Sequence, residues 1–401
     1  MSDRTFTFIL SSVCLLAASC DRGAATLSVP KSVSTGLRGH LLVIGGGLED
    51  DNKPVYERFV ALARAAAKSQ SPRIVIATAA SLNEQESATG KIQSIVAYCP
   101  TCKIDTIMRE TPAAETAALV DAASAMFFTG GDQKRITTRY LADDKDTPEA
   151  AAMRRLLARG GVIAGTSAGD AMMSDPMFFT GRSAEALGIR PTRKATADDG
   201  EDKTAGEMPL GPQIGKGMGF LPWAIVDSHF FERHRFGRLV AALETSHRRL
   251  GLGVSENACV EIGLETGEAI GISAAPSLLV DIGGITRDGL TRRNIRTTVI
   301  KQGRRISLTE RMRVEILPPR PRPTEVEHLL NVATPEDRQE AARRFFTLAE
   351  DASADFCTRL NLDGYDQIAW PTGIGWSNIE IVPQEIGTPA ASPRTTTAPR
   401  D

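Results

Sequence analysis

The stretch GVIAGTSAGDAMM, residues 161–173, contains a short apolar run that opens onto five small residues. Its segment Gly165-Thr166-Ser167-Ala168-Gly169 matches the pattern G-x-S-x-G, in which a sharp strand-to-helix turn lifts a serine above a sheet. Such a strained turn needs small neighbours, because Cβ atoms would clash where the backbone reverses. The pentapeptide alone leaves open an ordinary turn whose serine caps the helix.

On both sides of this stretch, apolar runs alternate with segments of helical periodicity. Strands are expected at 41–44, 73–78, 103–108, 125–129 and 161–164, and helices at 54–68, 84–98, 113–123 and 148–158. This alternation predicts an α/β fold with a mostly parallel, doubly wound sheet and helices on both faces. After residue 253, short strands separated by glycines predict an antiparallel continuation. Ser167 therefore ends a strand and begins a helix, as a nucleophile on such a turn must.

Composition sets limits on partners and cofactors. The chain has 401 residues, 42% of them hydrophobic, and a net charge of −2, which gives no overall attraction to nucleic acid or anionic lipid. The glycines at 45–47 lack the G-x-G-x-x-G spacing of a dinucleotide site, so no cofactor is expected. We expect these glycines instead to let the backbone pass close to the end of the sheet that carries Ser167.

The chain ends predict processing and accessory segments. Arg4 precedes an apolar run at 6–18 that ends in Ser19 and Cys20, which is typical of an export signal of the lipoprotein type. Residues 1–20 are thus predicted to be a signal, with Cys20 lipidated and the protein periplasmic or extracellular, attached to a bacterial membrane; an unstructured N-terminus is the alternative. A polar tether (21–37), a main domain (38–318), an extension after a proline-rich linker (319–386) and a disordered tail (387–401) follow. Within the main domain, residues 190–218 are expected to form a surface loop or lid.

Four cysteines remain after the predicted signal: Cys99, Cys102, Cys259 and Cys357. The Cys99-Pro-Thr-Cys102 segment could be half of a metal site or a redox pair, but neither a second such pair nor a nearby histidine completes a zinc site, so no metal is expected. In an oxidising compartment a structural disulfide is favoured. Four thiols allow three pairings, and the sequence does not choose among them.

A serine nucleophile needs a general base, and His229 is the best candidate among the five histidines. It follows an apolar strand at 224–226, at the carboxyl edge where reacting groups gather in open α/β sheets. A helix-capping or packing histidine is the alternative. Arg233, Arg235 and Arg238 come directly after it, and arginine forks suit an acidic substrate, although a solvated helix face would look similar.

These motifs together resemble those of the cyanophycinases, serine peptidases related to aspartyl dipeptidase (peptidase E). The resemblance is carried by FFTGGDQ (127–133), GTSAG (165–169), DSHF (227–230) and the arginine run, in this order, and LGVSEN (252–257) also fits. It spans roughly residues 40 to 285. The family implies a flavodoxin-like fold of the class I glutamine amidotransferase type, although the amidotransferases themselves use a cysteine nucleophile. It further implies a Ser-His-Glu triad and hydrolysis of cyanophycin to β-Asp-Arg dipeptides.

The resemblance also implies roles for individual residues. Ser167 matches the nucleophile and His229 the base. Glu185, eighteen residues after the serine, is expected to be the third triad member, with Asp175 in reserve. Residues that match substrate-binding positions are Gln133, Asp227, Arg233, Arg235 and Arg238. Ser228 replaces the family's usual glutamine, which leaves the exact substrate open.

Small residues at two places suggest where the oxyanion would bind. The backbone N–H groups of Ala168 and Gly131 are expected to hold it.

The sequence therefore predicts an exported serine exopeptidase acting on cyanophycin or a related β-aspartyl peptide. Two alternatives remain, namely an aspartyl dipeptidase and a catalytically silent, lipid-anchored binding protein. A homodimer is compatible with either.

Overall fold

The computed structural model describes residues 36–189, 210–313, 326–330, 335–349, 357–362, 364–371 and 377–384. Several predicted segments lie wholly or mostly outside these residues. They are the signal at 1–20 with Cys20, the tether at 21–37, the greater part of the loop at 190–218, the proline-rich linker at 318–323 and the tail at 387–401.

Eight strands form the first sheet, in the order β17-β13-β12-β1-β7-β4-β2-β3. They are β1 (His40–Ile44), β2 (Arg73–Ala77), β3 (Lys103–Ile107), β4 (Ala125–Phe128), β7 (Val162–Thr166), β12 (Cys259–Gly263), β13 (Glu268–Gly271) and β17 (Arg305–Ser307). Neighbouring strands from β1 to β3 are parallel. β12, β13 and β17 extend the sheet beyond β1 in antiparallel fashion. The predicted parallel sheet with an antiparallel continuation is confirmed.

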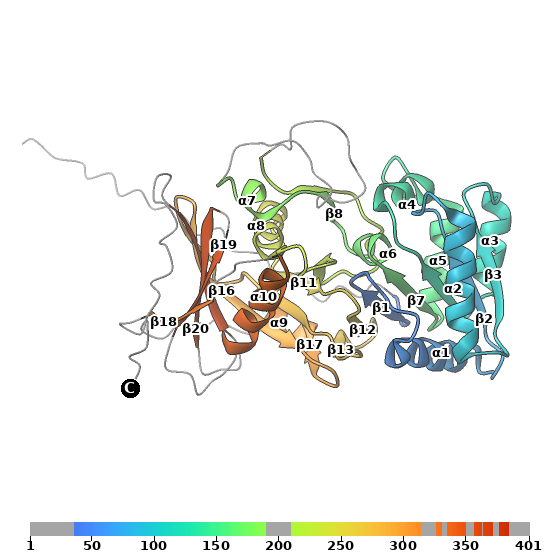
Figure 1. Ribbon diagram of the computed structural model, residues 1–401. Coiled ribbons are helices and arrows are strands. Elements are labelled where there is room, and N and C mark those ends of the chain that lie inside the picture. The colour runs from blue at the N-terminus through green and yellow to red at the C-terminus, as the bar shows by residue number, and fades with distance from the viewer. Residues whose placement is uncertain are drawn as a thin grey trace, which may run out of the picture.

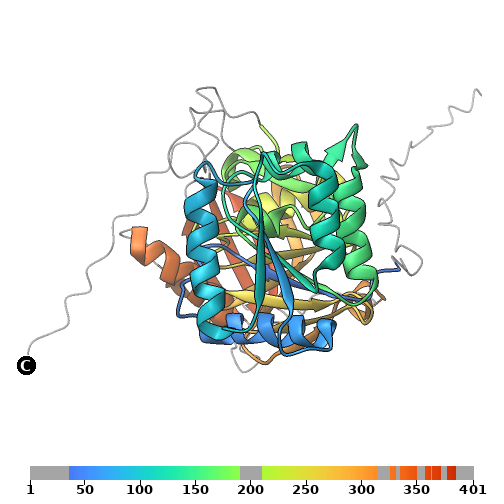
Figure 2. The ribbon, with the colours of Figure 1, turned by 90° about the vertical axis from the view of Figure 1, so that its right-hand side faces the viewer.

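Helices cover both faces of this sheet, as predicted (Figure 2). They are α1 (Lys53–Ala67), α2 (Glu84–Tyr98), α3 (Ala113–Ala122), α4 (Gln133–Tyr140) and α5 (Pro148–Ala158). Side chains alternate along each buried strand. Leu42 and Ile74 accordingly pack in one core with α1 and α2, whereas Val75 packs in another with α3 and α5. The sequence did not predict α4, whose residues are mostly polar.

The structure adds a second sheet that the sequence pattern did not predict (Figure 1). Its strands are β10 (Ala224–Asp227), β11 (Leu250–Val254), β14 (Ser277–Asp281), β15 (Thr286–Asp288), β16 (Thr291–Ile300), β18 (Val326–Leu330), β19 (Cys357–Leu362), β20 (Tyr365–Pro371) and β21 (Ser377–Pro383). The strand that precedes His229 therefore does not share a sheet with Ser167. β21 pairs with β16, so strands after the proline-rich linker are part of the same sheet as β10 and β11.

The remaining elements connect or cover the two sheets. They are α6 (Ala168–Ala171), α7 (Ser183–Ala186), α8 (Phe236–Ser246), α9 (Leu308–Arg313), α10 (Pro335–Ala349) and the short pairs β5 (Leu141–Ala142) with β6 (Lys145–Asp146) and β8 (Met177–Thr180) with β9 (Gln213–Gly215). Apolar side chains of α8 and α10 share one core with the second sheet. Within the described ranges, no helix combines the length and apolar character needed to cross a bilayer.

Cys99 and Cys102 form a disulfide between the end of α2 and the start of β3. This confirms the favoured disulfide and selects one pairing. Cys259 is a free thiol buried in the core. The side chain of Cys357 lies outside the described part of the chain.

Candidate active site

The turn at Ser167 joins β7 to α6, which confirms the predicted strand-turn-helix context. Ser167 has φ 55° and ψ −110°, a backbone conformation that costs free energy for any residue with a Cβ. The turn is held because Ser167 N–H donates to Ile44 O, at 3.0 Å. A Cβ at Gly165 would lie 2.1 Å from Gly169 O, so the small residues are required by space.

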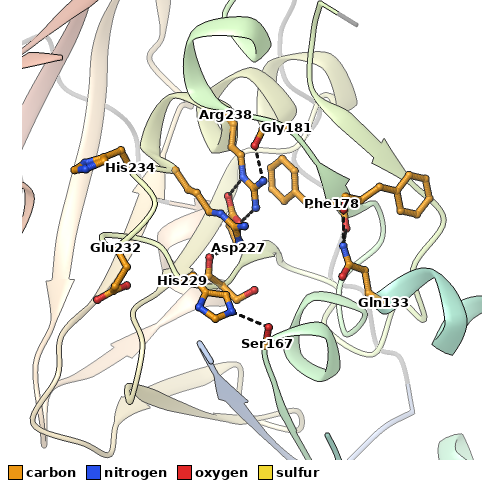
Figure 3. A network of polar contacts seen from close by, with 12 residues as sticks. Gln133, Ser167, Phe178, Gly181, Asp227, His229, Glu232, His234 and Arg238 are labelled. Atoms are coloured by element: carbon orange, nitrogen blue, oxygen red, sulfur yellow. Dashed lines mark hydrogen bonds and ion pairs between the residues drawn. The ribbon is translucent and has the colours of Figure 1, made fainter. Parts of the chain in front are cut away.

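His229 follows β10 of the second sheet and contacts Ser167, which follows β7 of the first sheet. Its Nε2 lies 2.7 Å from Ser167 Oγ (Figure 3). Its backbone has φ 47°, and its N–H donates to Gly45 O at 2.7 Å. The glycine run at 45–47 thus contacts the histidine directly, at the end of the sheet where the sequence predicted that these glycines matter.

The carboxylate that meets the other side of the imidazole is Glu256. Its Oε1 lies 2.6 Å from His229 Nδ1. Glu256 stands in the turn between β11 and β12, where the chain crosses from the second sheet to the first. The sequence offered a signal for it, because Glu256 falls in the segment LGVSEN that fits the family resemblance.

The structure therefore corrects the expectation for Glu185 and for its reserve, Asp175. Glu185 is buried in α7, which packs against α8, and Asp175 pairs with Lys216 Nζ at 2.6 Å. The expectation was wrong because it counted residues from the serine. The fold instead brings an acid to His229 from a later turn, through the pairing of β1 with β12.

Burial and nearby charges set the protonation of this pair. Burial lowers the pKa of His229; the charges of Arg233 and Arg235 lower it further, and the hydrogen bond to Glu256 opposes them. The pKa of Glu256 is lowered, chiefly by the hydrogen bond from His229. At neutral pH the imidazole is therefore neutral beside an ionised carboxylate, which is the state that a general base requires.

The expected substrate-binding residues Asp227, Arg235 and Arg238 instead bind one another. Arg238 donates from Nε to Asp227 Oδ2 at 2.8 Å, and from Nη1 to Gly181 O at 2.7 Å (Figure 3). Arg235 donates to Ser228 O at 2.7 Å. The side chains of Arg235 and Arg238 are buried, and both pair with the buried carboxylate of Asp227, which offsets part of the cost of burying their charges.

Arg233 differs from the other two arginines. It is half-buried, and its charge lowers the pKa values of both His229 and Glu256, which places it near the reacting groups. Its backbone N–H donates to His229 O at 3.1 Å. Of the three predicted arginines, Arg233 is thus the one beside the candidate triad with a partly exposed side chain.

Gln133 and the glycine turn at 130–131 lie at the first-sheet side of the site. Gln133 Nε2 donates to Phe178 O and Phe179 O, at 2.7 and 2.8 Å, so its amide group ties the start of α4 to β8. A Cβ on Gly130 would lie 3.5 Å from Ser167 Cβ. The turn thus lies against Ser167. It contains Gly131, one of the two predicted oxyanion donors, and the other, Ala168, directly follows the serine in the sequence.

Asp170 is an acid beneath the serine turn that the sequence analysis did not single out. It is fully buried, and neither carboxylate oxygen has a well-formed hydrogen bond. Burial raises the pKa of Asp170 well above its usual value, although the nearby Ser228 hydroxyl and the charge of Arg235 oppose the shift. This carboxyl therefore favours its neutral form.

Comparisons with known proteins identify a matching family model and related sequences. Residues 41–270 match the model of peptidase family S51. The cyanophycinase of Trichormus variabilis is 35% identical over 144 residues, which are 35% of this chain and 40% of the relative. That of Geminocystis herdmanii is 37% identical over 141 residues, 35% of this chain and 43% of the relative. The matched segment thus spans well under half of these curated relatives.

One solved structure, a peptidase from an acI-B1 actinobacterium, aligns with a TM-score of 0.47 at 16% identity and covers 68% of this chain and 98% of its own. The family model covers more than half of the sequence and includes Ser167, His229 and Glu256. The chain belongs to peptidase family S51.

Proposed function

We propose that this protein is a serine peptidase whose triad is Ser167, His229 and Glu256. One observation carries the proposal. The serine hydroxyl, the imidazole and the carboxylate form a continuous series of contacts of 2.7 and 2.6 Å. The strained backbone of Ser167 and the lowered pKa of His229 agree with it, because both are features of activated nucleophiles and bases.

In the proposed mechanism, Ser167 Oγ attacks the carbonyl carbon of the scissile bond while His229 Nε2 takes its proton. Glu256 holds Nδ1–H and stabilises the imidazolium that forms. The oxyanion binds to the backbone N–H groups of Ala168 and Gly131. His229 then protonates the leaving amine, and water hydrolyses the acyl-enzyme by the same steps in reverse order.

The proposed substrate is cyanophycin, a poly-aspartate backbone with arginine side chains, cut at the peptide bonds of its backbone so that β-Asp-Arg dipeptides are released with their β-linkage intact. Support comes from the cyanophycinases among the relatives and from Arg233, whose half-buried guanidinium can bind a substrate carboxylate. Ser228 is small, where the sequence resemblance leads one to expect glutamine. Contacts to the substrate at this position therefore differ from the family pattern.

The test is hydrolysis of insoluble cyanophycin by the purified protein, with products identified by mass spectrometry and Ser167→Ala as control. Release of β-Asp-Arg by the wild type alone supports the proposal. Cleavage of α-linked Asp-X dipeptides without action on cyanophycin would show an aspartyl dipeptidase instead. A wild-type protein that cuts neither substrate would favour the binding-protein alternative.

We also propose that the protein is exported and lipidated at Cys20. The apolar run at 6–18 supports this, and so does the disulfide between Cys99 and Cys102, since disulfides persist mainly in oxidising compartments. The test is metabolic labelling with a radioactive fatty acid in a bacterial host. Label that enters the wild type but not Cys20→Ser supports lipidation, and an unprocessed, unlabelled wild type contradicts it.

A further inference from the structure

The C-terminal extension packs directly on the turn that carries the proposed base. Phe346 of α10 stacks on Phe231, with ring centroids 5.4 Å apart, and meets Phe236 at 5.1 Å. All three rings are buried. The family model ends at residue 270, so α10 lies outside the region that defines the family.

The carboxylate of Glu232 joins this extension to the candidate triad. Glu232 Oε1 accepts from Arg343 Nη2 at 2.8 Å and from Gln339 Nε2 at 3.1 Å, both on α10. Its other oxygen, Oε2, accepts from the backbone N–H of Glu256 at 3.1 Å. Figure 3 shows Glu232 on the turn that continues from His229.

These contacts fix the one triad member that packing holds least. The side chain of Glu256 is 39% exposed, so solvent competes for its carboxylate and its position depends on its backbone. That backbone is held on one side because the next residue, Asn257, donates its N–H to Gly46 O at 2.7 Å. Glu232 supplies the hold on the other side.

Glu232 in turn depends on α10. Its side chain is only 8% exposed, and a buried carboxylate without its positive partner is costly. Without Arg343 and Gln339, Glu232 would turn toward water, and the N–H of Glu256 would lose its acceptor. Small displacements of an orienting group have large effects on rate, because the base must stay aligned with the nucleophile.

We propose that Arg343 and Gln339 are positioning residues, through which the C-terminal extension holds Glu256 and hence His229 in the reactive arrangement. The inference rests on the proposed function. It makes the extension an integral part of the site, acting through Glu232 and Glu256 rather than on the reacting atoms themselves.

The experiment measures how fast a fluorophosphonate probe modifies Ser167 in the full-length protein, and it needs no knowledge of the substrate. The maximal rate of modification, kinact, is separated from probe affinity, KI. Arg343→Ala is expected to lower kinact about tenfold with KI unchanged. Arg343→Lys, which keeps the charge, is expected to restore most of the rate. Arg344→Ala is the matched control, because its side chain is exposed on the same helix.

A double-mutant cycle tests whether Arg343 acts through Glu232. The Glu232→Ala/Arg343→Ala protein is expected to react no more slowly than Glu232→Ala alone, because both changes break the same link. Gln339→Ala, which leaves the ion pair intact, provides a milder variant should Arg343→Ala fail to fold; its kinact is expected to fall less, with an unchanged melting temperature.

The two proposals fail differently. A wild-type protein that the probe does not modify at Ser167 would overturn the proposed function and this inference together. If the probe labels the wild type normally, and Arg343→Ala and Gln339→Ala both have the kinact of the wild type, the inference alone is overturned. Additive losses in the double mutant would also overturn it, because Arg343 would then act independently of Glu232.

Discussion

Gly46 lies directly against the imidazole of His229. A Cβ on Gly46 would come within 2.3 Å of Cε1 and 2.5 Å of Nε2 of that ring. Gly46 also has φ +103°, which residues with a side chain rarely adopt. The end of β1 therefore shapes the site twice, because Ile44 O accepts the N–H of Ser167 and Gly46 leaves room for the base.

Gly46→Ala is expected to displace the imidazole from Ser167 and to lower kcat/KM about a hundredfold. Peptide hydrolysis or probe labelling of Ser167 measures the effect. Gly90→Ala is the control, since Gly90 lies in α2 with open space around its Cα and alanine is favoured in helices. Wild-type activity in Gly46→Ala would show that the ring does not need this space.

Glu256→Gln is expected to lower kcat by about a hundredfold or more, because an amide no longer stabilises the imidazolium and does not enforce the reactive tautomer. Glu185→Gln is the matched comparison, as it makes the same change at the acid that the sequence analysis favoured. It is expected to keep most of the activity. Steady-state kinetics of both variants decides between the two glutamates, and the opposite ranking would restore Glu185.

The sequence predicted the parts of the site that local pattern determines. The apolar run before Gly165 and the small residues around Ser167 together require a strand, a tight turn and a helix, and all three are present. His229 was found in the same way, as a histidine directly after an apolar strand. Its distance to the serine depended on a second sheet, which local periodicity does not reveal.

The missed features depend on contacts between distant segments. Glu256 reaches His229 because the turn after β11 crosses between the sheets, and no spacing along the chain encodes that crossing. The arginine run was expected to face a substrate, but Asp227 binds Arg238 in the interior. Whether an arginine faces solvent or an internal carboxylate depends on tertiary packing, so the local sequence of the run does not distinguish the two arrangements.

The pH dependence of kcat/KM reports the pKa of the general base in the free enzyme. Because burial lowers the pKa of His229, the acidic limb is expected to have its midpoint below the usual histidine value of about 6.5. Activity rises as pH increases through this midpoint, since only the neutral imidazole accepts the proton of Ser167. Glu256→Gln removes a contact that raises this pKa, so its midpoint is expected at still lower pH. A pH-rate profile of each protein checks both shifts, and a shift upward in the variant would contradict the assignment.

Asp170→Asn is expected to stabilise the protein at pH 8, raising its melting temperature by about 2 °C or more. Burial raises the folded-state pKa of Asp170, so its contribution to stability is full below the unfolded value of about 3.9 and is lost as pH rises through the folded value. Asparagine stays neutral, so the advantage over the wild type should shrink toward pH 4. Thermal unfolding between pH 4 and pH 8 measures the difference in melting temperature between the variant and the wild type. Asp143→Asn is the control, because Asp143 lies in an exposed turn. An equal or larger advantage at pH 4 would mean that ionisation of Asp170 is not the cause.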